Sequence, residues 1–401
     1  MKRKNFLKQA GVAGASFLLH QQMLAAFATV ADNTLKIGVV GCGDRGNGII
    51  RVMKESKAKF EVIAICDVLK FRVAAAQKLV PAAKVYTDFR QLIENKSIEA
   101  IVIATPLSLH YPIAVAALEA GKHIYLEKAM TYSIEEAILL VKLAKQYPKQ
   151  IIQVGHQYRY TPLYFKVKDM IAKGYLGKIT QIETRWDRNW NWRRPVPAGY
   201  TDEQVNWRMY KKYSGGLVAE LLSHQMDFIN WAFDTHPDVV YGTGGIDYYK
   251  DGRETYDNVQ VTMRYSKEGM IGNFGATCAN EREGYIFKLK GTKGTVSLLM
   301  HDGVFYPEKE TRKQLETVDG VTGATKLEWN KDGGVQIMNE PMKDGTWYAF
   351  EEFYKVVVEK STPVSNVITG GTTAICVHMA NQAIYNNTIQ NWKNEYNLAA
   401  Y

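Results

Sequence analysis

The feature that most constrains this fold is a glycine-rich turn at the end of a short apolar run. In "TLKIGVVGCGDRGNGIIRVM", the β-branched run 35–40 predicts a buried strand that leads directly into Gly41, Gly43 and Gly46. A strand, a turn with this glycine spacing and a following helix form the phosphate-binding element of dinucleotide-binding domains. The first glycine allows the tight turn, the second lets a pyrophosphate approach the backbone, and the third lets helix and strand pack closely.

Three acidic or basic neighbours complete the predicted cofactor site. Asp44 and Arg45 stand in this turn, and the helix that follows would present its free N–H groups to the phosphates. Asp67 ends the next apolar run, "FEVIAICDV", where an acid would bind the ribose 2′-hydroxyl. Because a carboxylate there would repel a 2′-phosphate, we expect NAD in preference to NADP. The alternative is a glycine-rich turn with a capping aspartate.

The rest of the chain divides into two patterns. Short strands alternate with helices as far as "KQIIQVGHQYRY", which indicates a doubly wound parallel sheet. Beyond it, runs such as "DNVQVTMRYS", "MIGNFGATCA" and "TKLEWN" alternate apolar and polar residues, as antiparallel strands with one covered face do. We therefore predict an α/β protein: a Rossmann domain at 34–155, then an α/β domain at 156–401 with a mixed, mostly antiparallel sheet and two C-terminal helices.

One predicted helix carries an unexpected polar stripe. "GGLVAELLSHQMDFINWAF" is apolar nearly all round, which indicates burial, yet it contains Glu220, His224 and Asp227. On an α-helix this spacing places the three side chains on one face. The stripe is either part of an active site, or a satisfied polar cluster or exposed helix edge.

The stretch "ATPLSLHYPIAVAALEAGKHIYLEKAM" resembles the signature region of the Gfo/Idh/MocA oxidoreductases, the glucose-fructose oxidoreductase and inositol dehydrogenase family. The resemblance runs from about residue 34 to the C-terminus. It implies a Rossmann domain followed by a domain whose open sheet carries the substrate and often forms an oligomer contact. It also implies a lysine near the nicotinamide and substrate, supplied by a Glu-Lys-Pro motif; here the motif is Glu127-Lys128, followed by alanine. Glu220 and His224 match the acid and histidine that the family places four residues apart.

The resemblance extends to the nicotinamide side of the cofactor site. Thr105, Pro106 and His110 form its Thr-Pro-x-x-x-His element, which implies a structural or nicotinamide-side role for His110. We place these three residues, together with Glu127 and Lys128, in the predicted cofactor site.

Alcohol oxidation by NAD supports the same assignment on chemical grounds. It requires a base for the hydroxyl proton, and an imidazole such as His224 titrates in the useful range. Glu220 would orient this imidazole or bind the substrate. Lys128 would polarise the developing alkoxide, and burial would lower its pKa.

Aromatic residues crowd the segment before the polar helix. "RWDRNWNWRRPVPAGYTDEQVNW" contains four of the chain's eight tryptophans, and aromatic rings pack on the C–H faces of sugars. We therefore predict substrate contacts from Trp190 and Trp192, from Gln157 and Arg159 at the domain junction, and from Asp227. The alternative is a structural loop whose tryptophans fill the core. His156 is as compatible with the core or surface as with the site.

Composition excludes several other classes. The net charge of +9 comes from dispersed lysines and arginines, which argues against nucleic-acid binding. The four cysteines lack CxxC spacing, and no cluster has metal-ligand spacing, so we predict no metal. No close pair of carboxylates for ordinary glycoside hydrolysis is identifiable.

The N-terminus indicates export. Residues 1–31 combine a basic start, an apolar stretch and the small-residue pattern Ala26-Phe27-Ala28, and the start resembles a twin-arginine signal with Lys4 as the second basic residue. No later apolar run is long enough to span a bilayer. We predict a periplasmic, homo-oligomeric enzyme that acts on a sugar or glycoside hydroxyl, at C3, and recycles its cofactor in place. The alternatives are a redox-neutral NAD-dependent glycosidase and a noncatalytic sugar- or NAD-binding protein.

Overall fold

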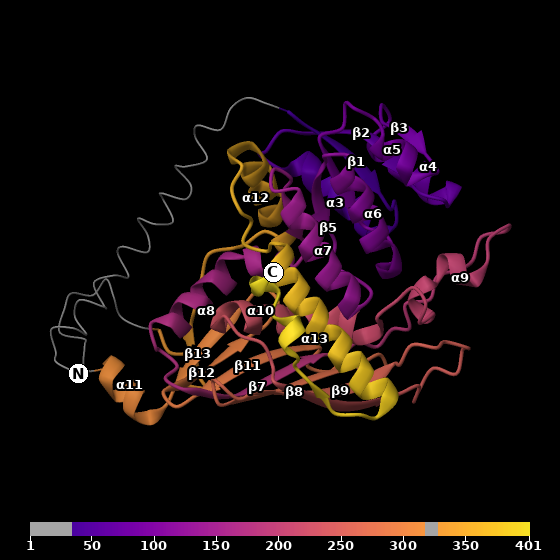
Figure 1. Ribbon diagram of the computed structural model, residues 1–401. Coiled ribbons are helices and arrows are strands. Elements are labelled where there is room, and N and C mark those ends of the chain that lie inside the picture. Colours follow the sequence, from indigo (N-terminus) through magenta and orange to yellow (C-terminus); the bar gives the residue numbers. More distant parts are fainter. Residues whose placement is uncertain (1–33, 317–327) are drawn as a thin grey trace.

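The computed structural model describes residues 34–316 and 328–401, which form two sheets with helices between and around them (Figure 1). The predicted export signal at 1–31 lies outside these residues. In the described part of the chain, no helix is long and apolar enough to cross a membrane.

The first sheet confirms the predicted doubly wound fold. Its parallel strands run in the order β3-β2-β1-β4-β5-β6. The chain reverses direction across the sheet between β1 and β4, so the carboxyl ends of these two strands border the crevice where ligands bind in such sheets. The strands are β1 (Leu35–Val40), β2 (Phe60–Cys66), β3 (Lys84–Tyr86), β4 (Ala100–Ile103), β5 (His123–Leu126) and β6 (Ile152–Val154). The helices between them are α3 (Asp44–Glu55), α4 (Lys70–Leu79), α5 (Phe89–Ile93), α6 (His110–Glu119) and α7 (Ile134–Gln146).

The second sheet is mixed and mostly antiparallel, as predicted. Its order is β14-β13-β12-β11-β7-β10-β9-β8-β15, and only β7 and β10 pair in parallel. Alternate residues of β9 are buried, which matches the predicted single covered face. The strands are β7 (Ile179–Trp186), β8 (Val239–Gly245), β9 (Asn258–Tyr265), β10 (Met270–Thr277), β11 (Tyr285–Gly291), β12 (Gly294–Leu298), β13 (Gly303–Pro307), β14 (Val335–Gln336) and β15 (Gln390–Asn391).

One predicted strand is wrong in its described part. Of "TKLEWN", residues 328–330 contribute a single bridge from Trp329 to Val335 and no strand. Helix α11 (Lys309–Glu316), which lies between β13 and this segment, was not predicted.

Helices fill the space between the two domains. Figure 1 shows α8 (Pro162–Ala172), α10 (Ser223–Phe233) and α13 (Val367–Asn386) between the second sheet and the Rossmann domain. Helix α13 is largely buried, contains no Asp, Glu, Lys or Arg, and packs against α7, α10 and β8. Helix α10, which carries part of the predicted polar stripe, is therefore packed between the second sheet and the Rossmann domain.

The last part of the chain returns to the first domain. In α12 (Gly345–Glu359), Phe350 and Phe353 are fully buried in the same core as Ile37 of β1. The rings of Phe350 and Tyr125 lie 4.3 Å apart between centroids. The predicted boundary at residue 156 therefore omits a helix that the Rossmann core needs.

Candidate active site

The glycine-rich turn has the geometry that a bound dinucleotide requires. Gly41 has a φ of 97°, and a Cβ at this position would lie 2.4 Å from the carbonyl oxygen of Ala104. A Cβ on Gly46 would lie 1.9 Å from the carbonyl oxygen of Gly41. A Cβ on Gly43 would meet nothing nearer than the guanidinium of Arg72 at 3.7 Å. The first and third glycines are thus sterically required, whereas the second borders open space at the start of α3, where a pyrophosphate fits.

Asp67 is fixed beside this turn at the end of β2. Its two carboxylate oxygens accept backbone hydrogen bonds from Cys42 at 2.8 Å and Leu69 at 2.9 Å. Each oxygen keeps a lone pair for a ribose hydroxyl. Asp44, by contrast, is exposed and forms a 2.9 Å ion pair with Arg194 of the second domain. The side chain of Asp44 therefore contacts the second domain, and its backbone N–H belongs to the free first turn of α3.

Arg45 and Glu127 bind each other. Arg45 Nε donates to Glu127 Oε1 at 2.7 Å, and its Nη1 donates to the Thr346 hydroxyl at 3.0 Å. Cofactor contacts were expected from both side chains, and the structure instead gives both a protein partner. The pair joins α3 to the end of β5 and so fixes the backbone that precedes Lys128.

His110 has a structural role, one of the two that the sequence allowed. Its Nδ1 lies 2.8 Å from the carbonyl oxygen of Ala129 and its Nε2 lies 3.1 Å from that of Thr105, so the ring joins β4 to the turn after Lys128. Burial lowers the pKa of His110. Pro106 precedes a short 3₁₀ turn. The buried hydroxyl of Thr105 has no hydrogen-bond partner within the described residues, which fits a polar edge of a bound nicotinamide.

Lys128 connects the two domains. Its Nζ donates to the main-chain carbonyl oxygens of Glu220 at 2.7 Å and Ala219 at 3.4 Å. An ammonium group carries three donors, so one remains for a substrate. Burial lowers the pKa of Lys128, although the carboxylates of Glu220 and Glu127 partly oppose this effect.

The polar stripe is not a regular α-helix. Residues Val218–Leu222 form a π-helical turn, and α10 begins at Ser223. A π turn closes i→i+5 hydrogen bonds, so residues four apart no longer align on one face. Within the described structure, the Glu220 carboxylate accepts from Arg208 Nε at 3.0 Å and makes no hydrogen bond to His224. The prediction that Glu220 orients the imidazole is therefore wrong in this geometry.

The local charges keep Glu220 ionised. Burial alone would raise the pKa of this carboxyl group. The positive charges of Arg208 and Lys128 outweigh that effect and lower it. Glu220 therefore carries a negative charge beside the lysine.

His224 is buried against an aromatic wall. The centroid of its ring lies 4.5 Å from that of Tyr158 and 5.6 Å from that of Trp186. Its Nδ1 is buried and has no hydrogen-bond partner among the residues that the structure describes. Burial and the charge of Lys128 lower the pKa of His224 well below its usual value. The imidazole is thus neutral at pH 7 and able to accept a proton.

Arg159 and Asp227, both of which were predicted to contact the substrate, bind each other in the structure. Arg159 Nε and Nη2 bind the two oxygens of Asp227 at 2.9 and 2.6 Å, and both side chains are almost fully buried. Thr373 also donates to Asp227 at 3.1 Å, while Arg159 donates to the carbonyl oxygen of Val364. His156 Nδ1 lies 3.3 Å from the same carboxylate. The protein itself satisfies the Arg159–Asp227 pair, whereas both ring nitrogens of His156 are buried without a hydrogen-bond partner among the described residues.

The residues predicted to contact the sugar lie in different surroundings. Trp192, with a φ of 62°, lines a pocket together with Arg208 and Glu220. Trp190 is exposed on the outer side of the loop. Gln157 is half-buried, and its side-chain oxygen has no partner among the described residues, so it is available to a ligand.

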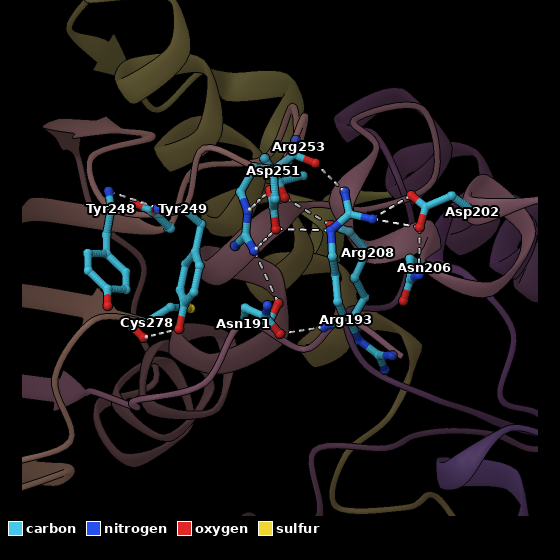
Figure 2. A network of polar contacts seen from close by, with 12 residues as sticks. Asn191, Arg193, Asp202, Asn206, Arg208, Tyr248, Tyr249, Asp251, Arg253 and Cys278 are labelled. Atoms are coloured by element: carbon cyan, nitrogen blue, oxygen red, sulfur yellow. Dashed lines mark hydrogen bonds and ion pairs between the residues drawn. The ribbon is translucent and has the colours of Figure 1, made fainter. Parts of the chain in front are cut away.

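Ion pairs hold the aromatic loop in place. Figure 2 shows Arg193 between two carboxylates: its Nη1 lies 2.6 Å from Asp202 and its Nε lies 2.9 Å from Asp251. Arg253 binds Asp251 from the other side at 2.8 Å. This network fixes residues 187–206, which we call the bridging loop.

The bridging loop also contacts the Rossmann domain near the glycine-rich turn. Arg72 donates to the carbonyl oxygen of Val205 at 3.3 Å, and the rings of Phe71 and Tyr200 meet edge to face at 5.1 Å between centroids. With the Arg194–Asp44 pair, three contacts cross from one domain to the other beside the predicted phosphate site.

Sequence reasoning missed two residues of the site. Tyr158 lies between two residues that were selected, but a lone tyrosine after a strand carries no signal of its own. Arg208 follows Trp207 at the end of the quoted aromatic stretch, and its pairing with Glu220 depends on the tertiary fold. No group of three or more potential metal ligands occurs in the described residues.

Comparison with known proteins identifies the family. The model of an oxidoreductase family with an NAD-binding Rossmann fold, Gfo/Idh/MocA, matches residues 35–156, and the model of the Gfo/Idh/MocA C-terminal domain matches residues 164–297. The chain belongs to the Gfo/Idh/MocA oxidoreductase family. The resemblance inferred from the sequence motifs is thereby confirmed.

Relatives in the family are named as polyol dehydrogenases. An inositol 2-dehydrogenase of Salmonella typhimurium is 29% identical over 199 residues, which are 49% of this chain and 54% of that protein. An NADP-dependent scyllo-inositol 2-dehydrogenase of Bacillus subtilis is 26% identical over 59% of this chain and 61% of its own length. The chain thus spans little more than half the length of the curated relatives it matches.

Solved structures share the fold over nearly the whole chain. A levoglucosan dehydrogenase in complex with NADH and L-sorbose superposes with a TM-score of 0.73 at 18% identity, covering 90% of this chain and 100% of its own. A myo-inositol 2-dehydrogenase from Lactobacillus plantarum gives a TM-score of 0.68 at 18% identity, with 90% and 100% coverage. At this identity the likeness establishes the fold alone.

Proposed function

We propose that the chain is an NAD-dependent oxidoreductase that oxidises a hydroxyl group of a sugar, polyol or glycoside. The observation that carries the proposal is a buried, neutral His224 beside the half-buried Lys128, at the junction of a dinucleotide-binding turn and an aromatic pocket. Relatives named for inositol and levoglucosan support the substrate class. Asp67, at the ribose position, supports NAD over NADP.

The chain's own residues supply acid–base chemistry. His224 takes the proton of the substrate hydroxyl at a ring nitrogen, because its low pKa leaves the imidazole unprotonated. The remaining N–H of Lys128 donates to the oxygen as negative charge develops there. Glu220 and Arg208 form an ion pair at the edge of the same pocket and bind hydroxyl groups of the sugar. The nicotinamide, when bound, supplies the hydride acceptor.

Two features make up the finer part of the proposal. The substrate is oxidised at C3, and the cofactor is recycled without leaving the protein. The contacts of the bridging loop with the Rossmann domain support retention of the cofactor. The N-terminal sequence supports export to the periplasm, where free cofactor is scarce, and the second sheet offers a face for a homo-oligomer.

The test is a panel of inositols and methyl glycosides incubated with the purified protein. We expect a keto product and a change in the absorbance of bound or added nicotinamide. His224→Gln should lower turnover by about 10²–10⁴-fold while NAD binding, measured by fluorescence, is retained. The proposal would be refuted if the protein, with NAD bound, oxidised none of these sugars.

The two alternatives predict different outcomes. Release of the aglycone without net redox change would identify a redox-neutral glycosidase. Sugar binding that is unchanged by His224→Gln, without turnover, would identify a binding protein.

A further inference from the structure

A second arginine stands at the aromatic wall of the proposed site. Arg188 follows β7 and is half-buried. Its guanidinium carbon lies 5.4 Å from the ring centroid of Trp186 and 5.4 Å from that of Trp192. The Trp186 ring is in turn 5.6 Å from that of His224. Arg188 therefore borders the place where the proposed sugar must lie.

Arg188 differs from the neighbouring arginines in having no carboxylate partner. Five arginines of the same region form ion pairs: Arg185 with Asp187, Arg193 with Asp202, Arg194 with Asp44, Arg208 with Glu220, and Arg253 with Asp251. Within the described residues, the guanidinium of Arg188 makes no hydrogen bond and no ion pair. Only its backbone N–H is bonded, to Thr277. The two indole rings compensate only in part for the hydration that this half-buried charge loses, which favours an external anion.

The charges around the proposed site also favour an anion. Among the described side chains assigned to the site, Arg188, Arg208 and Lys128 are positive and Glu220 is negative, while Arg45 and Glu127 form an ion pair with each other. Burial lowers the pKa of Arg188, and Arg188 itself helps to lower the pKa of His224. An oxidised nicotinamide would add one more positive charge. A neutral sugar would leave this excess uncompensated.

A guanidinium group suits a planar anion. When its face stacks on an aromatic ring, the N–H donors in its plane stay available. Those donors match the two oxygens of a carboxylate.

We propose that Arg188 binds an anionic group of the substrate, and that the substrate is a sugar acid: a hexuronic acid or its glycoside. The proposal rests on the oxidoreductase function proposed above and specifies its substrate class. Arg188 is then a specificity-determining residue, placed beside the aromatic wall.

The test compares methyl glucuronoside with methyl glucoside, which share the same ring and differ at C6. For the unmodified protein, kcat/KM should be higher for the acid. In Arg188→Gln, the ratio of acid to neutral kcat/KM should fall by about 10- to 100-fold, as expected for loss of a charge-assisted hydrogen bond. Arg185→Gln is the matched control, because Arg185 is an exposed arginine on the same segment with a carboxylate partner. It should leave the ratio unchanged.

Binding provides a measurement that does not depend on turnover. Tryptophan fluorescence of the NAD-loaded protein should report methyl glucuronoside binding that weakens with salt and is lost in Arg188→Gln. If no sugar is turned over but this binding persists, the oxidoreductase proposal fails and the anion site stands. A ratio that Arg188→Gln does not change, with neutral sugars turned over, overturns the anion site and leaves the oxidoreductase proposal standing. Preference for methyl glucoside 6-sulfate or 6-phosphate over the uronoside would overturn the assignment of a carboxylate.

Discussion

The buried pair between Arg159 and Asp227 separates a structural role from the substrate-binding role that the sequence favoured. Asp227→Ala removes two hydrogen bonds, of 2.9 and 2.6 Å, from a guanidinium that is almost fully buried. It also removes the acceptor of the Thr373 hydroxyl. Breaking a buried pair on one side costs about 3–5 kcal/mol, because the remaining charge stays in the core without compensation. That loss is a large part of the 5–15 kcal/mol typical of a whole domain.

Urea unfolding followed by tryptophan fluorescence measures this loss. Asp169→Ala is the control: Asp169 forms an exposed ion pair with Lys173 at 2.7 Å, so its removal should cost at most about 0.5 kcal/mol. The double variant Arg159→Met with Asp227→Leu should recover much of the stability, since no charge is left unpaired. The reasoning would be refuted if Asp227→Ala cost less than about 1 kcal/mol while raising KM for a sugar, because that result is expected of a substrate contact.

Three further predictions concern charge and backbone geometry. Lys128→Met should raise the pKa of His224, because the positive charge of Lys128 lowers that pKa. The acid limb of the kcat/KM profile, where the imidazole becomes protonated, should therefore move to higher pH, and an unmoved limb would exclude His224 as the base. Burial raises the pKa of Glu352 to about 7 in the folded chain, so folding becomes less favourable as pH rises from about 4.5 to 7. In denaturant titrations, Glu352→Gln should therefore be more stable than the unmodified protein by about 2–3 kcal/mol at pH 8 and should show no such advantage near pH 4. Gly46→Ala should abolish NAD binding measured by fluorescence titration, because its Cβ would lie 1.9 Å from the carbonyl oxygen of Gly41; retained affinity would show that the turn can relax.

Local sequence patterns were sufficient to predict the glycine-rich turn and the position of Asp67 beside it. Gly41, Gly46 and Asp67 act through their own backbone or through neighbours in the same turn, so their spacing determines what they do. The two sheets were predicted for a similar reason. A strand buried on both faces is apolar at every residue, and a strand buried on one face is apolar at every second residue.

The geometry of the polar stripe could not be predicted from the sequence. The polar stripe was analysed as an α-helix, and no feature of the sequence announces the π turn at Val218–Leu222. That turn separates Glu220 from His224, and the Glu220 carboxylate accepts a hydrogen bond from Arg208 instead. The pairing of Asp227 with Arg159 was not predicted, because the two residues lie in distant segments of the chain. Contacts between segments far apart in the sequence require the tertiary fold.

The return of α12 to the Rossmann core has a consequence for how the chain is made. Residues 345–359 are synthesised after nearly all the rest, yet Phe350 and Phe353 complete an apolar core that begins at β1. At about 5–20 residues per second, the first strand waits roughly 15–60 s for this helix. During that interval the face of the sheet that α12 will cover remains open to solvent and to chaperones. The Rossmann domain therefore cannot complete its core during synthesis before α12 has been made. Residues 34–155 expressed alone would expose the same face permanently.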